Sequence, residues 1–100
     1  MMENQQWYLF GPEARVLLLL YKEGEVVRSN IYHKHGLNYK ASLSALDYFK
    51  KCGVADFKLK GDYRGTQIWY LTPKGKIIAI KLAEVIALIE YDEKDPLKII

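Results

Sequence analysis

The sequence predicts a mainly helical α+β domain with a three-helix core, a small β-hairpin and a long C-terminal helix. Apolar residues recur at helical spacing in several segments, and two short alternating segments flank a turn bounded by glycines. A chain of 100 residues is long enough for about one hydrophobic core. We therefore expect a single domain over residues 1–100, with its core over 11–72, the long helix over about 73–91 and a polar-apolar tail over 92–100.

The first helix is predicted to begin at Gly11-Pro12, because proline is tolerated at the first helical position. Gly24 should end this helix as a left-handed cap. Residues 17–20 are four consecutive leucines, which is too continuous for one narrow apolar stripe. We therefore expect the helix to be buried on more than one side.

A brief strand and a second helix are predicted next. Val26-Val27 is apolar and β-branched, as short strands often are. Ser29 and Asn30 are candidate N-caps for the second helix, which should end near His35 with Gly36 as its terminator.

A third helix is predicted between Asn38, its N-cap, and Gly53, its terminator. The apolar face at helical spacing consists of Ser42, Ala45, Leu46 and Phe49. The opposite face consists of Lys40, Ser44, Asp47 and Lys51. Because only about three residues separate the second and third helices, they should form a helix-turn-helix corner.

A hairpin and a final helix complete the predicted fold. Apolar and basic residues alternate in the first strand, at residues 54–60, and Gly61 and Gly65 bound the turn to the second strand, at residues 66–71. Thr72-Pro73 supplies an N-cap followed by proline, which predicts the start of the last helix. A helix, a hairpin with a basic tip and another helix, in this order, are typical of a winged helix-turn-helix domain.

The last helix is apolar almost all round, since only Lys81, Glu84 and Glu90 are polar between Ile77 and Tyr91. A small domain cannot bury two faces of a terminal helix alone, so we expect a homodimer. The predicted interface consists of Ile78, Leu82, Val85 and Ile89, together with Trp7, Tyr8 and Phe10 ahead of the first helix. The three aromatic residues are alternatively candidates for a ligand pocket between the subunits, although nothing else in the sequence supports a small-molecule effector.

Positive charge is concentrated in the middle of the chain. The whole chain carries a net charge of +3, whereas residues 33–64 alone carry +4. This segment spans the end of the second helix, the third helix and most of the hairpin. A polyanion is the expected partner, and ordinary solubilising lysines are the alternative.

The chain resembles the winged helix-turn-helix transcription regulators of archaea and archaeal viruses, a group shared with multiple-antibiotic-resistance-type and PadR-like repressors. The resemblance lies in Gly11-Pro12-Glu13-Ala14, in residues 46–54 and in residues 70–76, and it covers about residues 11–91. It is closest to the short viral members. It implies a homodimer joined through the terminal helices, with the third helix in the DNA major groove and the hairpin, or wing, on adjacent backbone or minor groove.

The candidate DNA-binding residues lie on the third helix and the wing. Arg64 at the wing tip is the strongest single candidate, because an arginine between glycines can enter a narrow minor groove. Tyr39 either bonds a phosphate or packs against the second helix, and Tyr48 and Leu43 either touch a thymine methyl or shield the core edge. The full predicted set is Tyr39, Lys40, Ser42, Ser44, Tyr48, Lys51, Lys60, Tyr63 and Arg64.

Other classes of function find little support in the sequence. No nucleophile motif or phosphate-cradling glycine loop is present, so we expect no catalytic site and no cofactor. His33 and His35 point apart on a helix and cannot share a metal. Cys52 is either a buried thiol or forms a disulfide with Cys52 of a second subunit. With no signal peptide and no membrane-spanning run, an intracellular, cytoplasmic protein is expected (in the host cytoplasm if viral). The expected function is regulation of transcription through double-stranded DNA, and the alternative is a winged-helix protein-interaction module without DNA binding.

Overall fold

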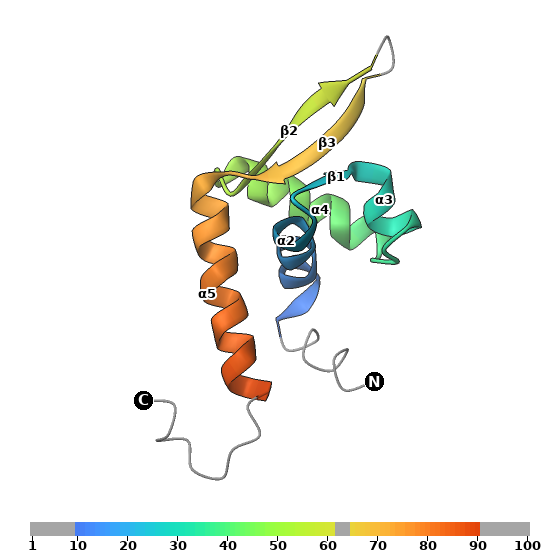
Figure 1. The fold of residues 1–100 in the computed structure, drawn as a ribbon. Coiled ribbons are helices and arrows are strands. Elements are labelled where there is room, and N and C mark those ends of the chain that lie inside the picture. Colours follow the sequence, from blue (N-terminus) through green and yellow to red (C-terminus); the bar gives the residue numbers. More distant parts are fainter. Residues whose placement is uncertain (1–9, 62–64, 91–100) are drawn as a thin grey trace.

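The computed structural model describes residues 10–61 and 65–90. Along the chain, the elements are α2 (Gly11–Glu23), β1 (Glu25–Val27), α3 (Arg28–His33), α4 (Tyr39–Lys51), β2 (Ala55–Lys60), β3 (Thr66–Leu71) and α5 (Pro73–Glu90) (Figure 1). The mainly helical α+β architecture is therefore confirmed. The predictions for Trp7, Tyr8, Tyr63, Arg64 and the tail over 92–100 lie outside the described residues.

The three strands form one antiparallel sheet in the order β1-β3-β2. The brief strand predicted at Val26-Val27 is therefore confirmed, and it lengthens the hairpin into a three-stranded sheet by pairing with β3. Trp69 in the central strand lies opposite Val26 on one side and Phe57 on the other, so the three share a face. This face belongs to the core, because Val26 and Trp69 are 5% and 4% exposed and Phe57 packs against the core cluster.

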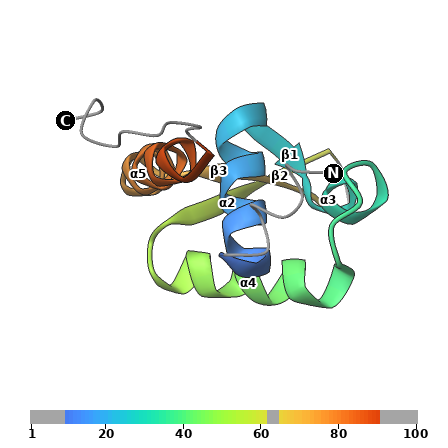
Figure 2. The ribbon, with the colours of Figure 1, turned by 90° about the horizontal axis from the view of Figure 1, so that it is seen from below.

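Helix α2 lies at the centre of the helical layer, between α4 and α5 (Figure 2). Its leucine run is buried as predicted: Leu17, Leu18 and Leu20 are all at most 9% exposed, and Leu19 packs against the core. The helix is therefore buried on more than one side, as predicted, because α4, α5 and β3 all contact it.

Helix α3 begins earlier than the sequence indicates, at Arg28, and its N-cap is Val27 with no side-chain hydrogen bond. The prediction that Ser29 or Asn30 caps the helix is therefore wrong. The physical reason is that the chain passes directly from β1 into α3: Val27 still has the extended backbone of the strand when the helix begins.

Helix α4 is capped at both ends as predicted. The Asn38 side chain accepts a hydrogen bond from the Ala41 N–H at 2.8 Å. At the other end, the Gly53 N–H donates to the Lys50 carbonyl at 3.1 Å and the Val54 N–H donates to the Phe49 carbonyl at 2.8 Å. These two bonds form a Schellman motif, which requires the positive φ of +75° that Gly53 adopts.

Helix α5 begins directly against the turn that ends α4. The Thr72 hydroxyl lies 2.6 Å from the Gly53 carbonyl and 3.0 Å from the Val54 carbonyl, and its oxygen accepts from the Gly75 N–H at 3.1 Å. The hydroxyl has one proton, so it donates to one of these carbonyls at a time. The predicted Thr72 cap is confirmed, and the same side chain joins α5 to the α4–β2 turn.

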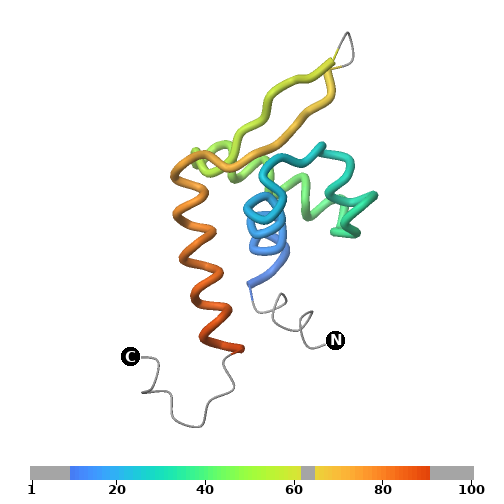
Figure 3. Tube along the Cα trace, viewed as in Figure 1, coloured from blue at the N-terminus to red at the C-terminus, as the bar shows by residue number. Residues whose placement is uncertain are grey.

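Beyond this junction α5 runs along α2 and away from the sheet (Figure 3). Its buried residues are Gly75 and Ala79. Leu82 packs partly against the core. Ala83 and Ile86 are half-buried, and the large exposed apolar side chains of this helix are those of Ile77, Ile78, Ile80, Val85, Leu88 and Ile89.

Candidate nucleic-acid interface

The outward face of α4 carries the exposed polar residues that the helical wheel predicts. Lys40, Ser44 and Lys51 are all exposed, and so is Tyr48, at 60%. The helix is amphipathic because its other face, at the i, i+3, i+4, i+7 positions, is buried against α2 and the sheet. The outward face therefore presents side chains with hydrogen-bonding groups on a well-anchored helix.

Ser42 does not belong to this face. Its side chain is 1% exposed and is buried on the same side of α4 as Ala45, Leu46 and Phe49. The prediction that Ser42 contacts DNA is wrong, because the helical spacing that places Lys40 and Ser44 outward turns position 42 toward α2.

Tyr39 is both packed and exposed. Its ring meets the ring of Tyr32 on α3 edge to face, with the centroids 4.7 Å apart, while 53% of the residue remains exposed. Of the two alternatives left open by the sequence, packing against the second helix is thus observed. The packing also fixes the ring at the helix-turn-helix corner.

The hydroxyl of Tyr48 stays protonated at neutral pH. The Cys52 side chain, one helical turn further on, raises the pKa of Tyr48, mainly through a side-chain hydrogen bond and next through its charge. Tyr48 therefore offers a neutral hydroxyl on the outer face of α4 and adds no negative charge there.

Three of the lysines in the basic segment form ion pairs within the chain. Lys50 lies 3.0 Å from Asp56, Lys51 lies 3.2 Å from Asp47, and Lys58 lies 2.9 Å from Glu25. These pairs are exposed, so each contributes little to stability, but each partly neutralises a charge that the sequence assigns to the interface. Within the described ranges, Arg28, Lys40 and Lys60 have no ion-pair partner.

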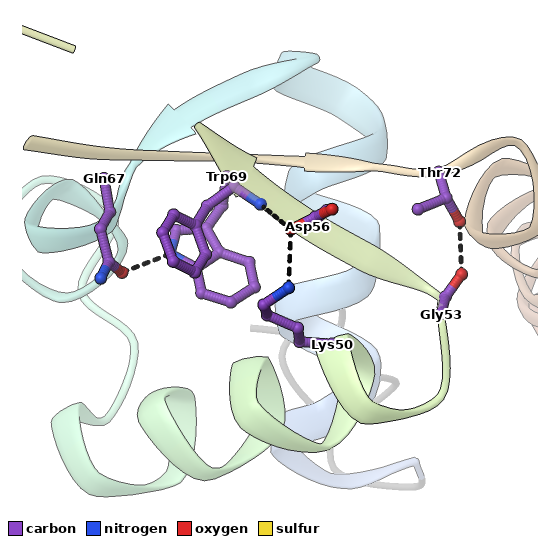
Figure 4. A network of polar contacts seen from close by, with 7 residues as sticks. Lys50, Gly53, Asp56, Gln67, Trp69 and Thr72 are labelled. Atoms are coloured by element: carbon purple, nitrogen blue, oxygen red, sulfur yellow. Dashed lines mark hydrogen bonds and ion pairs between the residues drawn. The ribbon is translucent and has the colours of Figure 1, made fainter. Parts of the chain in front are cut away.

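A groove of about 360 Å³ separates α4 from the hairpin. Its lining comes from α3, from α4 and from both hairpin strands: Arg28, Leu43, Leu46, Asp47, Lys50, Phe57, Gln67 and Trp69. Figure 4 shows the polar contacts around it, including the bond from Lys50 to Asp56 and the bond between Gln67 and Trp69.

Sequence reasoning missed Arg28 and Gln67 in this groove. Arg28 precedes the basic segment, and Gln67 lies in a strand that is mostly apolar and aromatic after it (Ile68 to Leu71). The one available signal was spacing, since Gln67 and Trp69 are two apart in a strand and must share a face. That this face borders α4 depends on how the hairpin packs, which the spacing does not specify.

The hairpin extends beyond the helical layer, which explains the exposure of its outer half (Figure 1). Leu59 is 65% exposed although it alternates as a core residue would. Lys60 is exposed, and Gly61 and Gly65 have the predicted positive φ angles of +92° and +66°. The tip residues Tyr63 and Arg64 lie outside the described residues.

The histidines and Cys52 lie apart from one another. His33 is exposed and His35 is half-buried, and the part of the chain that the structure describes contains no cluster of three potential metal ligands. Cys52 is a half-buried free thiol at the end of α4, and its disulfide with a second copy stays a prediction. Across residues 10–61 and 65–90, no helix has both the length and the apolar character needed to cross a bilayer.

Solved structures identify the fold. F-93 of SSV1 is 27% identical and superimposes with a TM-score of 0.61 over 82% of this chain and 92% of its own. AF1382 from Archaeoglobus fulgidus is 24% identical, with a TM-score of 0.69 over 80% of this chain and 89% of its own. MarR from E. coli, solved in complex with operator DNA, is 16% identical, with a TM-score of 0.66 over 79% of this chain and 56% of its own. The chain has a winged-helix fold.

In the terms of this fold, α3 and α4 form the helix-turn-helix and β2 and β3 form the wing. No family model and no curated protein matches the sequence. The resemblance to multiple-antibiotic-resistance-type regulators is confirmed at the level of the fold, since NMB1585 from Neisseria meningitidis, a MarR family regulator, also superimposes, with a TM-score of 0.64. This chain spans 55% of ZitR from Lactococcus lactis and 53% of NMB1585, about half the length of each.

The ion pair between Lys50 on α4 and Asp56 on β2 leads to a testable prediction about pH. The hydrogen bond from Lys50 lowers the pKa of Asp56 below its ordinary value of 3.8, and a second bond from the Phe57 N–H lowers it further. The stability that this carboxylate contributes is therefore present above its ordinary pKa and is lost as the pH falls through the lowered pKa.

We expect Lys50→Met to raise the pKa of Asp56 toward its ordinary value in an NMR titration, because the largest cause of the shift is removed. Lys58→Met is the matched control, since Lys58 pairs with Glu25 on another strand. An Asp56 titration unchanged by Lys50→Met would contradict the assignment of this pair.

Proposed function

We propose that the protein is a dimeric double-stranded DNA-binding protein that regulates transcription. One observation carries the proposal: in a winged-helix fold, the outward face of α4 presents exposed polar and basic side chains held rigidly at the helix-turn-helix corner. The fold is shared with MarR of E. coli, whose structure was solved with operator DNA.

In this proposal α4 enters the major groove. Lys40 and Ser44 lie on its exposed face, near the end where base edges and phosphates meet a recognition helix. Tyr39 and Tyr48 add exposed hydroxyls at either end of this face, and Lys51 contacts the backbone. Its ammonium has three donors, so Lys51 can contact the backbone and keep its pair with Asp47.

The wing contacts the adjacent backbone or minor groove. Lys60 is exposed near the end of β2. Tyr63 and Arg64 follow it in the sequence and, in the proposal, complete the contact from the tip.

The second copy packs on α5. Ile78, Val85 and Ile89 are 37%, 44% and 45% exposed, and they belong to the apolar stripe that the sequence predicts. Leu82, the fourth member, packs partly against its own core and therefore contributes less to a dimer than the sequence indicates. Phe10 is half-buried at the start of α2, and Trp7 and Tyr8 would join it. A helix with this much exposed apolar surface is typical of an interface.

A two-fold dimer would address a pseudo-palindromic site, with half-sites about one helical turn, or a multiple of it, apart. Affinity would come mainly from the lysines and arginines that neutralise phosphates, and it would therefore fall steeply as the salt concentration rises. Specificity would come from α4 and the wing.

Replacing Lys40 and Arg64 by alanine tests the proposal. We expect each change to weaken binding to a selected duplex by about 1–3 kcal/mol and to leave the circular dichroism spectrum unchanged; Lys40 is exposed on α4. Lys81→Ala, which removes the same charge from α5, is the control and should bind as the wild type does. Equal affinity of all three variants would refute the proposed interface.

The alternative function is a protein-interaction module, which the exposed apolar surface of α5 favours. Salt dependence separates the two functions. DNA binding should weaken steeply between low and physiological salt, whereas apolar association of α5 with another protein should not. A clean dimer with no affinity for duplex DNA even at low salt would favour the interaction module.

A further inference from the structure

We propose that the groove between α4 and the wing seats the sugar-phosphate strand that separates the major from the minor groove, and that Arg28 and Gln67 hold a phosphate of this strand. The inference rests on the proposed function. It adds two phosphate-binding residues from outside the basic segment. It also assigns the backbone between the two DNA grooves to the surface between α4 and the wing.

The path of the strand follows from DNA geometry. Adjacent major and minor grooves of a duplex are separated by one sugar-phosphate strand. If α4 occupies the major groove and the wing reaches the neighbouring minor groove, this strand must cross the surface between them. The groove lined by α3, α4, β2 and β3 is that surface.

Arg28 is the cation in the groove best able to bind a phosphate. Lys50, the other cation in the lining, is already bonded to Asp56 at 3.0 Å. Arg28 is exposed, and it has no ion-pair partner within residues 10–61 and 65–90. Its planar guanidinium can bind two phosphate oxygens at once, as a lysine cannot.

Gln67 is oriented by the tryptophan beneath it. The Trp69 indole N–H donates to the Gln67 side-chain oxygen at 3.1 Å, and since the indole is a donor only, the oxygen must face it. Trp69 is 4% exposed and packs against Phe57 with ring centroids 4.9 Å apart, so the indole is held in place. The amide NH₂ of Gln67 is thereby left as a donor for a ligand in the groove.

The remaining lining suits a sugar-phosphate strand. Leu43 and Phe57 supply apolar contacts for deoxyribose. The carboxylate of Asp47 also borders the groove and would repel a phosphate, but Lys51 lies 3.2 Å from it and partly neutralises it. The groove therefore combines a guanidinium that has no ion-pair partner among the described residues, one oriented amide and an apolar floor.

The test uses the full chain and a duplex selected by the wild type from a random pool. We expect Arg28→Gln to reduce the slope of log K against log salt by about 0.9, the value for one phosphate contact. Gln67→Glu keeps an acceptor for the indole but replaces the donating amide by a carboxylate, so it should also weaken binding. Lys81→Gln on α5 removes the same charge as Arg28→Gln and should leave the slope unchanged.

Duplexes with single neutral methylphosphonates then locate the contact. Neutralising the phosphate held in the groove should lower the DNA affinity of the wild type. The same duplex should lower the affinity of Arg28→Gln several-fold less, because the variant has already lost that contact. A wild type that binds DNA, with Arg28→Gln matching it in slope and at every methylphosphonate, would overturn the inference and leave the proposed function standing. A wild type that binds no duplex at low salt would overturn both.

Discussion

Gly75→Ala is expected to lower the melting temperature by roughly 8 °C or more, which corresponds to a loss of about 2 kcal/mol or more. A Cβ at position 75 would lie 2.0 Å from the Val54 carbonyl oxygen and 3.0 Å from its carbon. These are backbone atoms of the turn that ends α4, so no flexible side chain can move aside. In an exposed helix, a change from glycine to alanine stabilises the protein by about 1 kcal/mol. A loss of stability at position 75 would therefore indicate the close contact with Val54.

The junction explains why the effect should be large. Thr72 bonds to the carbonyls of Gly53 and Val54, and the Lys74 ammonium donates to the Cys52 carbonyl at 2.9 Å. Moving the first turn of α5 away would strain or break these bonds together. Lys76→Ala, at an exposed neighbouring position, is the control and should change the melting temperature little. A Gly75→Ala protein as stable as the wild type would mean that α5 does not dock against the turn.

Val85→Asp is expected to convert the proposed dimer into a monomer at concentrations where the wild type is dimeric. Val85 is 44% exposed on α5, so an aspartate there is tolerated by the monomer but would be buried without a partner in the interface. DNA affinity should then fall by about 10²–10⁴-fold, because the second half-site no longer binds as part of the same molecule. Mass by light scattering and affinity on a two-half-site duplex measure the two effects.

Lys81→Asp is the matched control, since it places the same side chain at an exposed polar position of the same helix. It should remain a dimer. If both variants stay dimeric, the apolar stripe of α5 does not form the interface. If both become monomeric, a negative charge anywhere on α5 disrupts the dimer, and the assignment of the interface to the stripe that contains Val85 is wrong.

The helices and the hairpin were predictable because their signals are local. Asn38 and Thr72 cap the helices that follow them, and Gly53 ends α4, as the sequence indicates. Each signal acts over a few residues of backbone, so it holds wherever the chain folds. The start of α3 was predicted wrongly because it depends on a contact that is distant in the sequence. Pairing of β1 with β3 keeps Val27 extended, and the helix begins directly after it without a polar cap.

The candidate site was only partly predictable. Helical spacing correctly places Lys40 and Ser44 on the exposed face of α4. The same spacing places Ser42 on the buried face, although the predicted DNA-binding set included it. Counting charges over residues 33–64 already includes Asp56, the partner of Lys50 six residues away. It overstated the basic surface at Lys58, whose partner Glu25 lies thirty-three residues away and outside that segment. Which charges neutralise each other depends on distance in space, and at these separations the sequence does not determine it.

By itself, then, the sequence of this protein determined the order of its helices and strands, the caps of α4 and α5, and the outward face of α4. Only the tertiary structure decided which lysines form the observed ion pairs, how closely Gly75 approaches Val54, and that Arg28 and Gln67 border one groove with α4. The physical reason is the distance along the chain over which each kind of interaction acts. Capping and periodicity act between neighbouring residues, whereas the groove, the ion pairs and the α5 junction exist only after distant segments pack and bury their common apolar surface.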